Sequence, residues 1–159
     1  MVNEGQPRTL TRDSSGYWSG TFQDVHAGDL YAYRLDGGAP MPDPASRYQP
    51  YGVHGPSQVI DPSAFRWSDD RFDPPTAERL VFYELHVGTF TPEGTFRAII
   101  DRLPHLVDLS VTAIELMPVA DFAGDRNWGY DGVAMFAPSR RYGTPDDLRA
   151  LVDAVYACL

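Results

Sequence analysis

The sequence predicts a β-rich amino-terminal part followed by an α/β part made of two consecutive strand-then-helix units. Up to about residue 68, aromatic, glycine and proline residues surround short apolar runs, whereas longer apolar segments with strand and helix spacing follow residue 80. An acidic segment with a Pro-Pro pair separates the two patterns. We therefore expect an amino-terminal domain over 1–68, a linker over 69–79 and an α/β domain over 80–159.

Short strands are expected in the amino-terminal part. One candidate covers residues 17–22, and a second covers 30–35, where Tyr31, Tyr33 and Leu35 share one face. This alternation predicts that the three side chains are half-buried. The turn-forming sequence at 36–38 ends the second candidate.

A proline-rich segment follows this turn. Four prolines between residues 40 and 50 each lack a backbone donor, so we expect an extended loop laid across a neighbour rather than a paired strand. A last short strand is expected at 58–60. These strands are fewer than the roughly seven of a complete sandwich, which predicts a sandwich truncated at its start.

The α/β part begins with a nearly continuous apolar run over 80–87, as expected for a parallel strand covered on both sides. Apolar residues at helical spacing over 96–107 predict a helix that Thr95 caps and that Pro104 kinks or restarts. A second buried strand is expected over 111–119. Strand, helix, strand and helix in this order predict parallel pairing.

The last helix has clear local signals. Thr144 can cap it, and Pro145 can occupy the first helical position, where its missing N–H costs nothing. Asp146 and Asp147 would then lie in the first turn, near the positive end of the helix dipole. The apolar residues expected along one face are Leu148, Leu151, Val152, Val155 and Leu159.

Trp128, Tyr130 and Asp131 occupy the long loop after the second expected strand, on the side where α/β folds bind ligands. An aromatic ring packs on the C–H face of a sugar, and a carboxylate accepts hydrogen bonds from sugar hydroxyls. The loop is therefore a candidate sugar-binding wall. Aromatic residues are also common loop anchors, so spacing alone favours the alternative of a loop held in place by buried aromatics.

Glu84 and His86 share one parity of the first strand, and both point either into a barrel lumen or toward the helices. A lumen position near the carboxyl end is the easier one for polar groups. Substrate contact by His86 and a purely structural hydrogen-bonded histidine remain alternatives.

Glu115 lies in the middle of the second expected strand, and no second carboxylate has a defined spacing to it. Retaining glycoside hydrolysis needs two carboxyl groups about 5 Å apart, so we interpret Glu115 as structural. Asp121, Asp125 and Asp131 are interpreted as loop residues, with Asp131 the best candidate for supporting a site. No phosphate loop, His-Glu-x-x-His zinc motif or serine elbow is present.

Composition narrows the function classes. The formal net charge of −9 argues against nucleic acid and anionic membranes as partners, because phosphate attraction would become repulsion. Cys158 is the single cysteine, which excludes an internal disulfide or a cysteine metal site. No signal-peptide pattern or membrane-length apolar run is present, and we expect a cytoplasmic protein without cofactor or metal.

Four sequence blocks resemble the α-amylase superfamily of glycoside hydrolases. They are YELHVGTF at 83–90, VTAIELMPV at 111–119, NWGYDG at 127–132 and YGTPDDL at 142–148. The phrases at 35–38, 42–47 and 54–57 are similar to the amino-terminal sandwich of the malto-oligosyltrehalose trehalohydrolases within it. These enzymes cut the α-1,4 bond next to the terminal trehalose of a maltooligosyl chain.

The resemblance implies a β-sandwich remnant followed by the first two βα units of a (β/α)8 barrel, and a maltooligosaccharide-type substrate. It implies that Tyr130 stacks on the sugar at the cleavage subsite. It further implies that Trp128 and Asp131 shape the wall of this subsite and that His86 lies beneath it. Ser110 stands where the family usually has a glycine.

The family's nucleophile Asp, acid/base Glu and third Asp would follow Leu159, so we expect a fragment truncated at both ends with no catalytic residue. Two units cannot close a barrel of about 250 residues. We expect the isolated chain not to release trehalose, and its open sheet to aggregate or form a molten state. Whether another chain supplies the missing barrel segment stays open.

Two alternatives remain. Within the enzyme class, a glycogen branching or debranching enzyme would share the barrel blocks. Outside it, a non-catalytic glucan-binding module would bind through the β part and the Tyr130 loop without cutting the chain.

Overall fold

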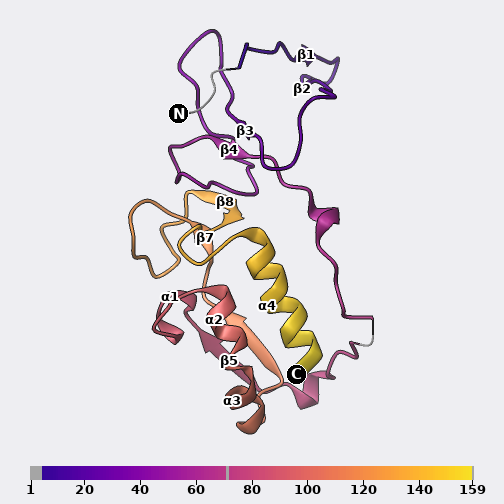
Figure 1. Ribbon diagram of the computed structural model, residues 1–159, viewed down its shortest axis with the longest axis vertical. Coiled ribbons are helices and arrows are strands. Elements are labelled where there is room, and N and C mark those ends of the chain that lie inside the picture. Colours follow the sequence, from indigo (N-terminus) through magenta and orange to yellow (C-terminus); the bar gives the residue numbers. More distant parts are fainter. Residues whose placement is uncertain (1–4, 71, 159) are drawn as a thin grey trace.

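The computed structural model describes residues 5–70 and 72–158, and its parts are arranged along the long axis of the molecule (Figure 1). The irregular amino-terminal part with its short strands lies at one end. The α/β part lies at the other, with the hairpin of β7 (Ala120–Asp121) and β8 (Ala134–Pro138) between them (Figure 1). The β-then-α/β order predicted from the sequence is thus confirmed in these residues.

The amino-terminal strands pair in two antiparallel couples. Strand β1 (Thr11–Arg12) pairs with β2 (Trp18–Ser19), and β3 (Leu30–Tyr31) pairs with β4 (Ser57–Gln58). Each strand has only two residues, so the longer strands predicted over 17–22 and 30–35 are wrong in extent.

The sequence also predicted that Tyr31, Tyr33 and Leu35 are half-buried along one face, and this is wrong for the residues after Tyr31. Tyr33 is 41% exposed and Leu35 63% exposed, because β4 pairs only with Leu30 and Tyr31. The predicted turn does follow, with Asp36 at φ 50° and the Gly38 N–H donating to the Leu35 carbonyl at 2.8 Å.

The proline-rich segment folds against the α/β part, as the extended-loop prediction anticipated. Its residues Ser46, Gln49 and Val53 are buried. A Cβ on Gly52, whose φ is +89°, would lie 3.1 Å from the guanidinium carbon of Arg140. The backbone therefore approaches this arginine closely enough to need a glycine.

The segment predicted as a linker is packed rather than free. The short 3-10 helix η1 (Pro62–Ala64) precedes this segment, and a second one, η2 (Ala77–Arg79), forms its end. Ser68 donates to Asp153 through its backbone N–H at 2.7 Å and its hydroxyl at 2.8 Å. Phe72 stacks on Tyr156 with 4.1 Å between ring centroids.

Two parallel strands form the centre of the α/β part. Strand β5 (Phe82–Leu85) pairs in register with β6 (Ala113–Leu116), which confirms the predicted parallel pairing. The predicted covering of both faces is wrong: Leu85 is buried, but Phe82 is 63% exposed and Glu84 is exposed, because the described helices cover one face only.

Three short helices connect these strands: α1 (Val87–Phe90), α2 (Phe96–Ile100) and α3 (Leu103–Asp108). The predicted cap is confirmed, since the Thr95 hydroxyl accepts from the Ala98 N–H at 3.2 Å. The break between α2 and α3 confirms the restart at Pro104, which lies in the first turn of α3, where no backbone donor is needed.

Helix α4 (Pro145–Cys158) packs against α2 and α3. Its cap is as predicted: the Thr144 hydroxyl accepts from the Asp147 N–H at 3.2 Å, and the Asp147 carboxylate accepts from the Thr144 N–H at 2.8 Å. Leu151 is buried, while Leu159 lies outside the described residues.

The core of this part joins buried residues of β5 and of the four helices with three residues of the connecting segments. Its buried members are Leu85, Val87, Phe96, Ile99, Leu103, Leu106, Val111, Phe122, Tyr142 and Leu151.

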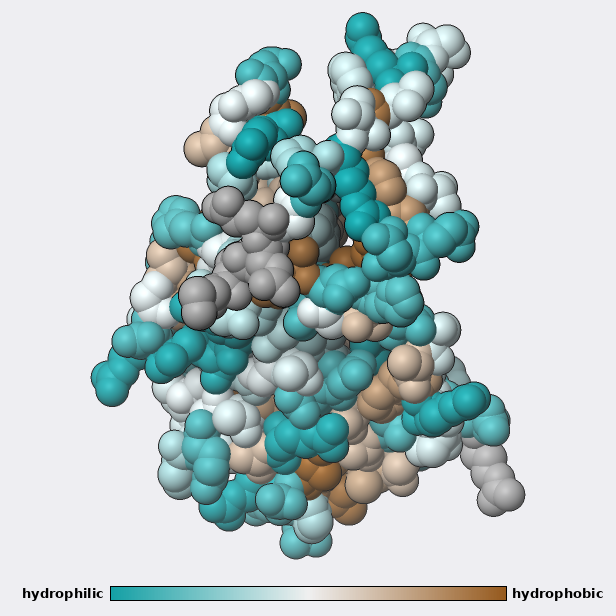
Figure 2. Space-filling model, turned by 45° about the horizontal axis from the view of Figure 1, so that its top comes forward, coloured by the Kyte–Doolittle hydropathy of each residue, from teal (hydrophilic) through white to brown (hydrophobic). Residues whose placement is uncertain are grey.

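An antiparallel hairpin, β7 (Ala120–Asp121) with β8 (Ala134–Pro138), lies between β6 and α4. The sequence predicted one long loop there, so this is a correction. Val133, Met135 and Phe136 of the hairpin are more than half exposed. On the face drawn in Figure 2, hydrophobic residues lie in small groups separated by hydrophilic ones.

Candidate functional site

The segment 127–131, called here the aromatic loop, lies within the hairpin between β7 and β8. Its two aromatic side chains point into solvent, since Trp128 is 76% exposed and Tyr130 is 72% exposed. The alternative of a loop anchored by buried aromatics is therefore wrong. Two exposed rings and an adjacent exposed Asp131 are an arrangement that can bind a sugar.

Asn127 fixes the shape of the aromatic loop. Its Oδ1 accepts from the Gly129 N–H at 2.6 Å and from the Asp131 N–H at 3.3 Å. Its Nδ2 donates to the Asp131 carboxylate at 3.1 Å. The sequence reasoning did not identify this residue, although an asparagine that precedes a glycine by two positions is typical of a turn closed by a side chain.

Gly129 allows the loop to pass close to the end of β6. Its φ is +105°, and a Cβ there would lie 2.3 Å from the Pro118 carbonyl oxygen. No side chain fits at that distance. The loop therefore depends on a glycine both for its backbone conformation and for space.

His86 connects the loop to the carboxyl end of β5. Its Nε2 lies 2.7 Å from the Asn127 carbonyl oxygen, so this nitrogen carries a proton and donates it. Its Nδ1 lies 3.3 Å from the Thr89 hydroxyl. Both ring nitrogens thus have protein partners, which favours the structural interpretation of His86 over direct substrate contact.

Tyr142 supports His86 from the other side. It is 4% exposed, its hydroxyl lies 3.3 Å from the Nε2 of His86, and the two rings meet edge to face. Burial raises the pKa of Tyr142, so this phenol stays protonated. The sequence reasoning assigned no role to this tyrosine, because an aromatic residue before a helix looks like ordinary core.

A buried ion pair lies behind the hairpin. The Asp121 side chain is fully buried, and Arg140 donates to both of its carboxylate oxygens at 3.0 Å. Ser139 donates to the same carboxylate at 3.1 Å. The interpretation of Asp121 as a loop residue is wrong, because it belongs to β7. Asp125 is a loop residue, as predicted, and its carboxylate lies 3.4 Å from the guanidinium of Arg141 on the surface.

Glu84 and Glu115 are register partners in β5 and β6, and both are exposed on the sheet face opposite the helices. The structure thus puts Glu84 on the lumen-type face that the parity argument favoured. Among the described residues, no group of three or more His, Cys, Asp or Glu side chains could hold a metal ion. No helix in the described ranges is both long and apolar enough to cross a membrane.

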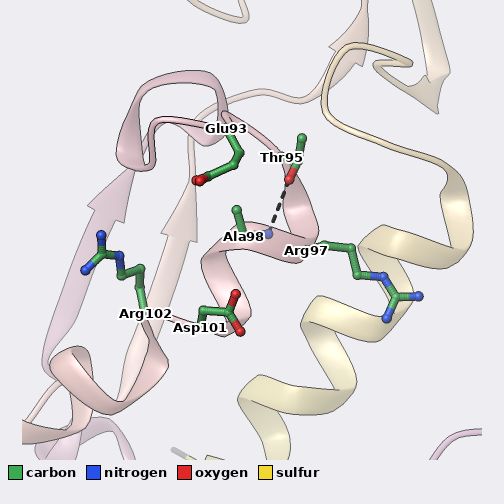
Figure 3. Close-up of a pocket in the computed structure, with 6 residues that line it drawn as sticks. All are labelled: Glu93, Thr95, Arg97, Ala98, Asp101 and Arg102. Carbon is green, nitrogen blue, oxygen red and sulfur yellow. Dashed lines mark hydrogen bonds between the residues drawn. The ribbon is translucent and has the colours of Figure 1, made fainter.

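A pocket of about 560 Å³ lies elsewhere, beside α2 (Figure 3). Its lining residues are Glu93, Thr95, Arg97, Ala98, Asp101 and Arg102. They offer no aromatic ring, and Arg97 is paired with Asp147 at 2.7 Å, so the aromatic loop remains the better candidate for a sugar site.

No protein-family model matches this chain. Curated relatives do: the malto-oligosyltrehalose trehalohydrolase of Saccharolobus solfataricus is 50% identical over 92% of this chain and 26% of its own length. The Deinococcus radiodurans enzyme of the same name is 52% identical over 83% of this chain and 22% of its own. The 1,4-alpha-glucan branching enzyme GlgB of Aliivibrio fischeri is 31% identical over 94% of this chain and 23% of its own length.

Solved structures agree with these sequence relatives. A crystal structure named "Putative alpha Amylase" from Salmonella typhimurium superposes with a TM-score of 0.89 and 47% identity over 93% of this chain and 25% of that one. A pullulanase from Anoxybacillus sp., complexed with maltotetraose, gives a TM-score of 0.75 at 22% identity over 91% of this chain and 27% of that one, which shows the shared fold alone. The chain therefore spans about a quarter of the length of the relatives it matches.

Proposed function

We propose that this chain is the glucan-binding part of an α-amylase-family glycoside hydrolase. The proposal rests on its similarity to malto-oligosyltrehalose trehalohydrolases, of which it matches about a quarter of the length. The whole enzyme would cut the α-1,4-glucosidic bond next to the terminal trehalose of maltooligosyltrehalose and release trehalose. Residues 1–68 would belong to its amino-terminal β-sandwich, 69–79 to the linker and 80–159 to the first two βα units of its (β/α)8 barrel. The parallel pair β5 and β6, with helices on one face, supports this placement.

The observation that carries the proposal is the exposure of Trp128 and Tyr130 on a loop that the protein holds in one shape. Large exposed rings have no packing role here, whereas they suit the C–H face of a glucose ring. Asp131 beside them can accept from sugar hydroxyls. We propose that Tyr130 stacks on the sugar, that Trp128 and Asp131 shape the wall, and that His86 supports them from beneath.

No residue of the 159 is assigned a catalytic role in this proposal. Retaining glycosidases place two carboxyl groups about 5 Å apart across the scissile bond. Asp131 is already bonded to Asn127, and Glu84 and Glu115 are register partners that stand side by side on one sheet face rather than across a scissile bond. We therefore propose that the 159-residue polypeptide binds glucan without hydrolysing it; trehalose release from maltooligosyltrehalose above a buffer blank would contradict this.

A binding titration tests the proposal. Maltotetraose is added to the chain while tryptophan fluorescence is followed, and we expect saturation that weakens when Tyr130→Ala removes the stacking ring. Tyr17→Ala is the matched control, since Tyr17 is 74% exposed but lies near β2 in the amino-terminal part. An unchanged signal in the wild type, or equal losses in the two variants, would contradict the proposed site.

A branching enzyme is the second candidate, favoured by the 31% identity to the Aliivibrio fischeri GlgB. The two activities differ in product, because trehalose release and branch-point formation are distinguished by chromatography of the reaction on a full-length version. The higher identity to the trehalohydrolases supports the first candidate.

A further inference from the structure

Asn127 stands out because one side chain satisfies three groups of the aromatic loop at once. Its Oδ1 accepts from two backbone N–H groups, of Gly129 at 2.6 Å and of Asp131 at 3.3 Å. Its Nδ2 donates to Oδ2 of Asp131 at 3.1 Å. A carboxamide can accept on one atom and donate on the other, and this network fixes which atom is oxygen.

The backbone of Asn127 adds a fourth connection. Its carbonyl oxygen accepts from the Nε2 of His86, which follows directly after β5. The start of the loop is thereby tied to the end of a core strand, while its other residues are held by the Asn127 side chain. Between these connections, Trp128 and Tyr130 have no burial of their own to hold them in place.

From these contacts we infer that Asn127 is a positioning residue for α-glucan binding: it holds Trp128, Tyr130 and Asp131 in the conformation that meets the sugar. The inference rests on the proposed function and extends it to a residue that does not itself touch the sugar. A loop ordered in advance loses less conformational freedom when the ligand binds, so affinity depends on this amide.

The same contacts assign the two oxygens of Asp131. Oδ2 is bonded to Asn127, whereas no described residue donates to Oδ1. Oδ1 therefore keeps its full capacity to accept from a sugar hydroxyl, whereas Oδ2 has already accepted one bond. Asn127 in this way fixes the direction of the carboxylate.

The experiment uses the whole chain with Trp18→Phe and Trp67→Phe, so that Trp128 is the single fluorophore. Three variants are compared in this background. Asn127→Ala removes all side-chain bonds, and Asn127→Asp keeps the acceptor but replaces the donor to Asp131 with a second carboxylate that repels it. Arg126→Ala is the control, because Arg126 is an exposed neighbour in the same hairpin. Circular dichroism melts confirm that each variant is folded.

Two readouts are taken: the fluorescence anisotropy of Trp128 without ligand and the Kd for maltotetraose. We expect Asn127→Ala to raise the Kd about tenfold, which corresponds to an ordering cost of about 1.4 kcal/mol that returns at binding. We expect anisotropy to fall in parallel, Asn127→Asp to lose at least as much as Asn127→Ala because the two carboxylates repel, and Arg126→Ala to match the parent on both readouts.

The outcomes separate this inference from the proposed function. If the parent binds and Asn127→Ala binds equally well with unchanged anisotropy, the inference is overturned while glucan binding stands. If the parent does not bind maltotetraose, the proposed function fails, and the Trp128 anisotropy alone decides whether Asn127 orders the loop. An unchanged anisotropy in folded Asn127→Ala overturns the positioning role, and a lower anisotropy supports it.

Discussion

Two glycines of the hairpin share a left-handed backbone conformation but differ in their surroundings. Gly124 has φ +87° with no atom near a would-be Cβ, whereas a Cβ on Gly129 would lie 2.3 Å from the Pro118 carbonyl oxygen. An alanine in this conformation costs about 1–2 kcal/mol from the backbone alone. The difference in destabilisation between alanine at position 129 and alanine at position 124 therefore measures the cost of the clash with Pro118.

We expect Gly124→Ala to lower the free energy of unfolding by about 1 kcal/mol. We expect Gly129→Ala to lower it by at least about twice as much, because the backbone of the aromatic loop or of Pro118 must move as well. Urea denaturation followed by circular dichroism measures both. Equal losses would mean that the loop moves away from Pro118 without cost.

Arg140 neutralises a carboxylate that is fully buried, whereas Arg141, next in the chain, pairs with an exposed one. Removing one partner of a buried pair leaves an uncompensated charge and costs about 3–5 kcal/mol. Removing an exposed pair costs about 0–1 kcal/mol. We expect Arg140→Ala to destabilise strongly and Arg141→Ala weakly in the same urea experiment; similar effects would contradict the role given to Asp121.

Single residues show what the sequence could and could not predict about the site. Trp128 and Tyr130 were predictable as candidates, because their loop follows a strand on the side where α/β folds bind ligands and an aromatic ring packs on a sugar. Asn127, His86 and Tyr142 act through a hydrogen-bonded chain whose members come from three separate segments. No local spacing encodes such a contact. Asp121 was misread for the same reason, since its partner lies on the far side of the hairpin.

At the scale of elements, the start of α4 links helix capping to acid stability. Asp147 bonds to Thr144 at the cap and to Arg97 of α2 at 2.7 Å. Burial acts to raise the pKa of Asp147, but the hydrogen bonds from Arg97 and Thr144 outweigh it and hold the pKa below its ordinary value of 3.8. The folded chain thus keeps this carboxylate ionised at lower pH than the unfolded chain does.

A lowered pKa in the folded state contributes stability that is present above pH 3.8 and is lost as the pH falls through the lower, folded-state value. We expect Asp147→Asn to be less stable than the wild type near pH 6 and to lose less stability between about pH 5 and pH 3. Melting temperatures across this range measure it. Asp146→Asn, which leaves Asp147 intact, should retain the wild-type acid loss; an identical acid loss in Asp147→Asn would contradict the linkage.

The caps and helices were predictable because their signals are local. Thr95, Thr144 and Pro104 act within one turn, and each was confirmed. The hairpin was not predictable. Its strand β8 ends in a proline and pairs with only two residues of β7, so neither strand has the length or alternation that predicts a strand. Pairing here depends on the buried Asp121, a tertiary feature.

At the scale of the molecule, the amino-terminal and α/β parts meet in two places. Arg140, held by Asp121, lies against Gly52 of the proline-rich segment. The predicted linker runs beside α4, where Phe72 and Ser68 contact Tyr156 and Asp153 (Figure 1). The linker composition predicted its surface position but not these contacts, because acidic and proline-rich segments are usually free of packing.

The stack of Phe72 on Tyr156 gives the linker a measurable stability of its own. An aromatic pair contributes about 1 kcal/mol beyond burial, which corresponds to about a fivefold change in the population of the open segment. Trypsin cuts after arginine, and the sequence places Arg71 within the segment and Arg66 and Arg79 at its two sides. Where opening is fast, the cleavage rate follows that open population. We expect Tyr156→Ala to raise the rate of cleavage after these three arginines about fivefold, with Tyr17→Ala, which lies near β2, at the wild-type rate. Equal rates in both variants would show that the linker is held by Ser68 and Asp153 alone, and Asp153→Ala would then be the variant that opens it.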